Sequence, residues 1–146
     1  MHKYMNKELN LCAVIMHSKP GYKTGKKNKI FDNLLNQNFT IDCKNKVWCT
    51  DFTYMRQPNG KFRYNGSIID LYDRSAVASL NSDYINTDLA ISTLNTALEN
   101  ENYPKVILHS DQRGQFTSWE FVNFCKENNI TQSMSKAGCP YDNAPM

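Results

Sequence analysis

Two aspartates occur where strands are predicted, and together their carboxylates could hold a divalent cation. Asp51 lies inside the strand-like run 47–55, although aspartate is depleted in strands. Asp111 follows the apolar run 106–108, at the point where a strand meets its loop. Taken alone, an aspartate at the first position is more commonly an edge-strand residue facing water, and one at the second is more commonly a turn residue. The two positions become informative only when they are considered together.

The predicted topology brings these aspartates close to one another. The strand at 106–108 is expected to run parallel to the strand at 47–55, because a helical crossover precedes it. The fold implied by the resemblance described below places the two strands side by side. Two carboxylates at close range raise each other's pKa unless a cation joins them. A hard divalent ion, Mg²⁺ or Mn²⁺, is the usual partner of such oxygen ligands. Two such ions about 3.5–4 Å apart can hold the attacking and leaving oxygens of a phosphodiester in line.

Periodicity and turn residues predict the elements that position these side chains. The strands are predicted at residues 47–55, 62–72, 76–80, 106–108 and 130–135. The first three follow one another as hairpins, so they are expected to pair antiparallel. One helix is predicted to begin at Asn86 or Thr87, and a second to open with the capping box Thr117-x-x-Glu120. The result is an α/β domain, a five-stranded mixed sheet with flanking helices.

Length and composition limit the alternatives. A chain of 146 residues with 40% apolar content is sufficient for one compact domain. It has no apolar run of the roughly 18 residues that a membrane span requires. Five cysteines occur at irregular spacing without a Cys-x-x-Cys pair, so neither a disulfide framework nor a zinc finger is expected. A reducing cytoplasm is the predicted location.

A basic connector precedes the first strand, at residues 19–46. Its lysines are Lys19, Lys23, Lys26, Lys27 and Lys29, interleaved with proline, glycine and tyrosine. A flexible basic arm with an aromatic residue is suited to contact with a phosphate backbone. Considered alone, a lysine run of this kind is more commonly a solvated linker. The net charge of +3 adds only weak evidence for a polyanionic partner.

Three stretches, at residues 47–54, 106–118 and 133–146, resemble the catalytic core of bacterial insertion-sequence transposases of the IS-three family. That family belongs to the retroviral-integrase-like group with the ribonuclease H fold. The resemblance extends from about Phe31 to the last residue and places three motifs in the right order. It implies a homo-oligomeric enzyme that uses two Mg²⁺ or Mn²⁺ ions to nick double-stranded DNA at terminal inverted repeats. The exposed 3′-hydroxyl is then joined to a new phosphodiester by direct transesterification.

The same resemblance assigns roles to individual residues. Asp51 and Asp111 are expected to be catalytic acids and metal ligands. Gln112, Gln115 and Asn143 are expected to contact DNA, although Asn143 is also suited to fixing its loop. His109 is expected either to contact a phosphate or metal-bound water, or to be a satisfied histidine at a strand end.

Arg113 departs from the family pattern, in which glycine is common at this position. Arginine here is expected either to hold a phosphate or to strain a turn that requires a positive φ. Both alternatives concern the loop that carries Asp111.

The family's third carboxylate, a glutamate on a helix, is expected immediately after Met146. The sequence is therefore expected to be a fragment with two of three acids, inactive when alone. Residues 1–18 are expected to be the remnant of an N-terminal helical DNA-binding region. Residues 47–146 are expected to form an integrase-like core without its C-terminal helices.

Two other functions remain open from the sequence. The chain could be a non-catalytic DNA-binding remnant that forms mixed assemblies with an intact transposase and inhibits it. It could also be a ribonuclease-H-like nuclease, although the additional acids of that family are not evident. The resemblance implies a bacterial cytoplasmic protein that associates with the nucleoid when bound to DNA.

Overall fold

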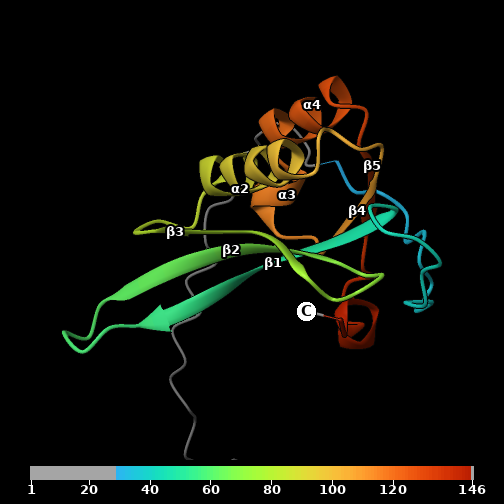
Figure 1. The fold of residues 1–146 in the computed structure, drawn as a ribbon. Helices are drawn as coiled ribbons and strands as arrows, with labels where there is room; N and C mark the ends of the chain where they lie inside the picture. The colour runs from blue at the N-terminus through green and yellow to red at the C-terminus, as the bar shows by residue number, and fades with distance from the viewer. Residues whose placement is uncertain (1–28, 146) are drawn as a thin grey trace, which may run out of the picture.

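A five-stranded mixed sheet forms the centre of the molecule (Figure 1). The computed structural model describes residues 29–145, so four of the five lysines of the basic arm and the predicted remnant 1–18 lie outside the described residues. The strands are β1 (Val47–Arg56), β2 (Phe62–Asp70), β3 (Ala76–Ser82), β4 (Ile107–Ser110) and β5 (Thr131–Met134). Their order in the sheet is β3-β2-β1-β4-β5. The five predicted strands are confirmed, with ends that shift by one or two residues.

The strand directions agree with the predicted topology. β1, β2 and β3 pair antiparallel as two successive hairpins, and β4 and β5 run parallel to β1. β1 lies directly beside β4, with Cys49 opposite His109 in the register. A helical crossover separates β3 from β4, which is the connection that parallel strands require.

Among the described residues, three α-helices lie between the later strands: α2 between β3 and β4, and α3 and α4 between β4 and β5. α2 (Thr87–Asn100) begins at Asn86, whose side chain accepts a hydrogen bond of 3.0 Å from the Leu89 amide, as predicted. α3 (Gly114–Thr117) is a single turn that was not predicted, and α4 (Trp119–Glu127) follows it. A short 3₁₀ helix, η1 (Pro140–Asn143), lies near the C-terminal end.

The predicted capping box at the start of α4 is wrong by one residue. The cap is Ser118, whose hydroxyl accepts from the Phe121 amide at 3.3 Å. Thr117 belongs to α3, and its hydroxyl bonds the Arg113 carbonyl one turn earlier. Ser118 has the extended backbone of a cap, with φ −64° and ψ 151°.

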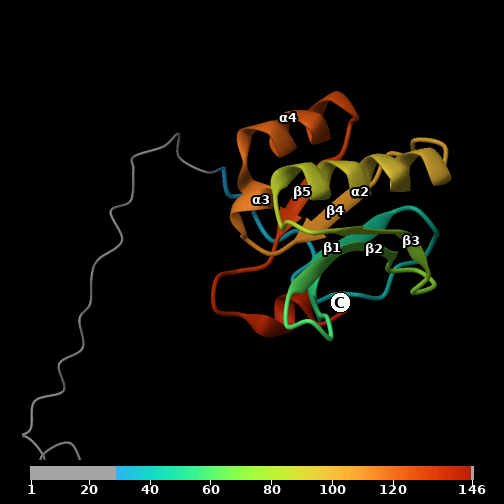
Figure 2. The ribbon, with the colours of Figure 1, turned by 90° about the vertical axis from the view of Figure 1, so that its left-hand side faces the viewer.

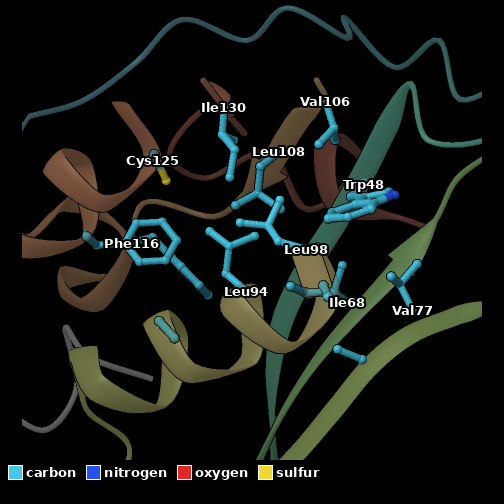
Figure 3. Close-up of a cluster of buried hydrophobic side chains, with 14 of the residues drawn as sticks. Trp48, Ile68, Val77, Leu94, Leu98, Val106, Leu108, Phe116, Cys125 and Ile130 are labelled. Carbon is cyan, nitrogen blue, oxygen red and sulfur yellow. The ribbon is translucent and has the colours of Figure 1, made fainter. Parts of the chain in front are cut away.

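All three helices cover one face of the sheet, whereas η1 lies on the other side (Figure 2). The main core fills the space between the helices and the sheet, and Figure 3 shows Trp48 from β1, Leu94 and Leu98 from α2, and Leu108 from β4 within it. Phe116 of α3 is fully buried and stacks on Phe52 with 4.9 Å between ring centroids. The residues of β1 therefore alternate between the two faces of the sheet, with Trp48 and Phe52 toward the helices.

The opposite face of the sheet has a smaller apolar cluster, which is covered by segments without helix or strand structure. Leu35, Val47, Cys49 and Leu71 form this cluster, and Phe39 and Ile41 pack against it. The described part of the connector thus contributes apolar contacts to the sheet. In the residues the structure describes, no helix is long and apolar enough to cross a bilayer, and the four cysteines are free thiols.

Gly66 of β2 permits the close approach of α2. A Cβ atom at this position would lie 2.8 Å from Thr93 Oγ1 and 3.3 Å from a ring carbon of Phe52. Thr93 is buried, and its hydroxyl already donates to the Leu89 carbonyl at 2.7 Å, so it has little freedom to move. Gly66 therefore sets the distance between the sheet and its main helix.

Substitution Gly66→Ala is expected to lower the free energy of unfolding by about 1–3 kcal/mol, the usual cost of overpacking a core. Urea denaturation followed by circular dichroism measures this change. Gly114→Ala is the matched control, because a Cβ there meets nothing within 4 Å. The double variant Gly66→Ala/Thr93→Ala is expected to regain part of the loss. An unfolding midpoint of Gly66→Ala equal to that of the wild type would contradict this account.

Candidate active site

The register of β1 and β4 places two aspartates at the same level of the sheet. Cys49 and His109 are opposite one another. Asp51 stands two residues beyond Cys49 in β1, and Asp111 stands two residues beyond His109, immediately after the end of β4. Because side chains alternate between faces, both aspartates point to the face that the helices do not cover. The expected proximity of the two carboxylates is thus a result of simple in-register pairing.

A single guanidinium group connects these carboxylates. Arg113 Nε lies 2.9 Å from Asp111 Oδ2, and Arg113 Nη1 lies 3.2 Å from Asp51 Oδ1. The side chains of Asp51 and Asp111 are 28% and 25% exposed, and that of Arg113 is 39% exposed. One permanent positive charge therefore faces two partly buried carboxylates.

Main-chain amides hold the orientation of both carboxylates. The Phe52 amide donates to Asp51 Oδ1 at 2.7 Å, and the Arg113 amide donates to Asp111 Oδ1 at 3.0 Å. Burial raises the pKa of Asp111 above its ordinary range, and the charge of Asp51 acts in the same direction. The bonds from Arg113 oppose this shift without cancelling it.

A cavity of about 460 Å³ opens beside the two carboxylates. It is lined by Asp51, Asp111, Gln112, Ser135, Lys136, Ala137, Gly138, Cys139 and Asn143. Asn143 donates a long bond of 3.4 Å to Asp51 Oδ2, while its amide oxygen is buried without a hydrogen-bond partner. A buried acceptor without a donor is uncommon, and here it lies next to a carboxylate at the cavity wall.

Gly138, in the wall of the cavity, has a positive φ angle. Its φ of +78° lies in the left-handed region that favours glycine. The turn at Gly138 directs the chain from β5 into η1, which carries Asn143 back to Asp51.

His109 is a satisfied buried histidine, which is the second of its two predicted roles. The Leu34 amide donates to Ser133 Oγ at 3.0 Å, and Ser133 Oγ is 2.9 Å from His109 Nδ1. His109 Nε2 lies 2.9 Å from the Asp142 carbonyl oxygen, which can only accept. Nε2 therefore carries a proton, and Ser133 Oγ, which accepts from the Leu34 amide, can donate its own proton to Nδ1 of a neutral ring. Burial lowers the pKa of His109 below its ordinary value.

Asp142 fastens the C-terminal turn to the connector. Its carboxylate accepts from Asn33 Nδ2 at 2.9 Å, from Gln37 Nε2 at 2.8 Å and from the Lys136 amide at 3.0 Å. The Gln37 bond is the main reason why the pKa of Asp142 lies below its ordinary value. This carboxylate is a structural anchor, and more than 100 residues separate it from its two side-chain partners.

The structure brings together only some of the residues predicted to contact DNA. Gln112 lines the cavity with its amide nitrogen on the Ser135 carbonyl at 3.0 Å, and Asn143 lines it too. Gln115 lies elsewhere and donates to the Ile85 carbonyl at 3.3 Å. Lys29 is exposed, and its ammonium lies 4.9 Å from the centre of the Phe31 ring.

One of the two alternatives predicted for Arg113 is wrong. Arg113 has φ −62° and ψ 151°, an ordinary extended conformation, so the turn needs no glycine there. Sequence reasoning also missed the contact of Arg113 with both aspartates, as well as Lys136 and Ser135 in the cavity wall. The one sequence signal for the Arg113 contact is that this basic residue lies only two positions after Asp111.

Lowering the pH is expected to destabilise the fold through His109. The folded state holds this ring neutral, so the unfolded state binds more protons once the pH falls below about 6.5, the ordinary histidine pKa. Stability attributable to His109 is therefore complete above that pH and is lost below it.

Thermal unfolding between pH 7.5 and 5 checks this expectation, with His109→Gln as the comparison. The variant is expected to show a smaller decrease of the melting temperature across this range, whatever its absolute stability. Asp111 contributes with the opposite sign in both proteins, so the difference between them isolates His109. Parallel pH profiles for the two proteins would refute the assignment.

Known proteins share both the sequence and the fold. The family model described as integrase core domain matches residues 42–140. Transposase InsF of insertion sequence IS3A from Escherichia coli K12 is 36% identical over 116 residues, which cover 79% of this chain and 40% of InsF. The uncharacterized 31 kDa protein of insertion element IS600 from Shigella sonnei is 32% identical over 115 residues, which cover 78% of this chain and 42% of that protein. The chain thus spans about two fifths of the length of these curated relatives.

Two viral proteins are among the solved structures with this architecture. The simian T-cell lymphotropic virus intasome has a TM-score of 0.66 at 16% identity, covering 83% of this chain and 41% of that one. The HTLV-2 integrase catalytic core domain in complex with magnesium has a TM-score of 0.57 at 20% identity, and the match covers 62% of this chain and 61% of that one. These neighbours confirm the predicted ribonuclease H-like fold. With the match over residues 42–140, they lead to the conclusion that the chain belongs to the integrase core domain family.

Proposed function

We propose that this chain is the catalytic core region of a DNA transposase of the insertion-sequence type. The activity is metal-dependent cleavage of phosphodiesters at the ends of an insertion sequence, followed by strand transfer. The observation that carries the proposal is the pair Asp51 and Asp111, held side by side at a cavity by the register of β1 and β4. Family membership supplies the reaction class, and the relatives named above supply the type of substrate.

The residues around the cavity fit one hard divalent ion such as Mg²⁺ or Mn²⁺. Asp51 and Asp111 would hold it through carboxylate oxygens, and the unpartnered amide oxygen of Asn143 is a third donor of the same kind. Among residues 29–145 there is no group of three or more His, Cys, Asp or Glu side chains suited to a metal. When bound, such an ion lowers the cost of the charge that develops on the attacking and leaving oxygens.

The chain's own side chains would position the DNA around this ion. Lys136 lines the cavity on one side of Asp51, and Arg74 lines a second hollow of about 690 Å³ on the other. These cations are suited to phosphates on either side of a scissile bond, and the lysine arm at residues 19–29 would extend the contact along the duplex. Gln112, fixed by the Ser135 carbonyl, is suited to a further contact at the same edge.

The family's site contains a third acid, which residues 1–146 do not supply. For this reason we expect little activity from these residues by themselves. Two carboxylates and an amide oxygen are too few ligands for a clamp of two ions. We therefore propose that a second carboxylate-bearing element is needed for strand transfer. The active assembly is proposed to be a homo-oligomer on double-stranded terminal repeats.

Substitution Asp51→Asn or Asp111→Asn is expected to weaken binding of Mn²⁺ to the 146-residue chain by at least the tenfold to hundredfold that loss of an outer-shell partner typically costs. Isothermal titration calorimetry measures the affinity. Asp83→Asn is the matched control, because Asp83 is an exposed aspartate paired with Arg63 outside the cavity. Equal Mn²⁺ affinity in the wild type and the two cavity variants would overturn the proposed metal site.

A joining assay on model insertion-sequence ends tests the activity. The 146-residue chain is expected to give no detectable strand transfer with Mg²⁺ or Mn²⁺. A chimera that appends the InsF segment following the matched region is expected to join DNA, and the same chimera with Asp111→Asn is expected not to. Efficient joining by the 146-residue chain would refute the need for a third acid.

The alternative of a non-catalytic DNA-binding protein has one observation in its favour. Arg113 already neutralises part of the charge of Asp51 and Asp111, so these carboxylates are not free in the absence of metal. Salt-sensitive duplex binding by a chimera that never joins DNA is the outcome that this alternative requires.

A further inference from the structure

Arg113 occupies the position between two carboxylates where a bridging cation would bind. Its guanidinium takes one oxygen of each aspartate, Oδ1 of Asp51 and Oδ2 of Asp111. The other two carboxylate oxygens are also engaged, by Asn143 Nδ2 at 3.4 Å and by the Arg113 amide at 3.0 Å. All four oxygens of the pair therefore have donors before any metal enters. An ion that bridges the aspartates has to replace at least the guanidinium.

The side chain of Arg113 can leave without disturbing the loop that carries it. Its carbonyl accepts from the amides of Phe116 and Thr117 at 3.1 and 3.2 Å, which anchors the backbone as the start of α3. Its amide bonds to Asp111 independently of the side chain. The backbone is extended and unstrained, and the side chain is more than a third exposed. Movement of the guanidinium into solvent thus requires only rotation about side-chain bonds.

The electrostatics of the pair give this side chain a function. Asp51 and Asp111 repel one another when both are ionised, and a partly buried position increases that repulsion. Arginine stays protonated at any physiological pH, so it neutralises the pair permanently while it remains there. A divalent ion brings twice the charge and accepts oxygen ligands directly. The two cations therefore compete for the same oxygens.

We propose that Arg113 is a resident counter-ion of the metal-free site, which stabilises the Asp51–Asp111 pair and is displaced when a divalent ion binds. This inference rests on the proposed metal site and adds the residue that sets its affinity. Arg113 acts as a positioning residue in the metal-free state. Its presence lowers the affinity for the ion, because part of the binding free energy is used to break two ion pairs.

The test compares Mn²⁺ binding by the wild-type 146-residue chain, Arg113→Ala and Arg113→Gln, measured by calorimetry at fixed ionic strength. Both variants are expected to bind Mn²⁺ about tenfold more tightly, the change that two partly exposed ion pairs can produce. Arg113→Gln keeps the bulk and a hydrogen-bond donor, so it serves if the alanine variant folds poorly. Arg63→Ala is the matched control, because Arg63 pairs with Asp83 away from the cavity. Its Mn²⁺ affinity is expected to equal that of the wild type.

Thermal unfolding gives a second readout. In EDTA, Arg113→Ala is expected to melt below the wild type, because the two carboxylates lose their counter-ion. With saturating Mn²⁺ the difference is expected to disappear or reverse. A purely structural arginine would produce the same difference in both conditions, and that result would overturn the proposal.

The displacement itself can be observed in the unaltered protein. The chain has four arginines, so the ¹⁵Nε–H signals form a small set in which Arg113→Lys identifies one. Titration with Mg²⁺ is expected to shift that signal and leave the signal of Arg63 in place.

The outcomes separate this inference from the proposed function. Equal, measurable affinity in the wild type and both Arg113 variants overturns the counter-ion role and leaves the metal site intact. No Mn²⁺ binding by any of these proteins overturns both. An unchanged Arg113 signal at saturating Mg²⁺ overturns displacement alone.

Discussion

Two negative charges held at the same level of adjacent parallel strands are the constraint on which the rest of the site depends. The register of β1 and β4 sets Asp51 beside Asp111, and no rotation of a side chain can move one of them to the other face. Such a pair is unfavourable unless a positive charge lies between its members. In the metal-free protein that charge belongs to Arg113, whose guanidinium contacts both aspartates.

A network of hydrogen bonds holds the wall of this cavity in place, and the residues at the centre of the network are buried. His109 and Ser133 are fully buried in β4 and β5, and each forms a hydrogen bond to a segment outside the sheet. Asp142 binds the same two segments to one another through Asn33 and Gln37. Buried polar groups are stabilising only when their partners are complete, and here they are. The network therefore keeps η1, and with it Asn143, against Asp51.

Much of the fold was predictable because its signals are local. The turn residues of the hairpins and the Asn86 cap are each read over a few residues, and the crossover rule gives the parallel direction of β4. The fold that the family resemblance implies then places β4 beside β1. α3 was missed because four residues are too few to show a helical period. Thr117 was predicted as the cap because Glu120 three residues later completes a capping-box pattern, whereas the residue three positions after Ser118 is Phe121.

The parts of the site that were not predictable depend on contacts between distant segments. The anchor between Asp142 and Gln37 spans 105 residues, and no pattern in either segment indicates the other. Arg113 lies two residues from Asp111, yet its second contact, with Asp51, exists only because β1 is the neighbour of β4. Topology could therefore place the two acids, whereas the cation between them required the path of the loop.

One face of the sheet carries most of the apolar core, and the other carries the charged residues of the candidate site. This separation explains how an arginine can occupy position 113. The helical face contains the large apolar core, so the fold does not depend on the charged face for most of its burial. On the charged face, the extended backbone at Arg113 accepts any side chain, and only the balance of charge distinguishes one residue from another. Glycine there would leave two carboxylates unneutralised until a metal arrived, at a cost in stability. Arginine removes that cost. If the proposed metal site is used, the ion has to compete with Arg113 for it, which would be a trade of function against stability at a single residue.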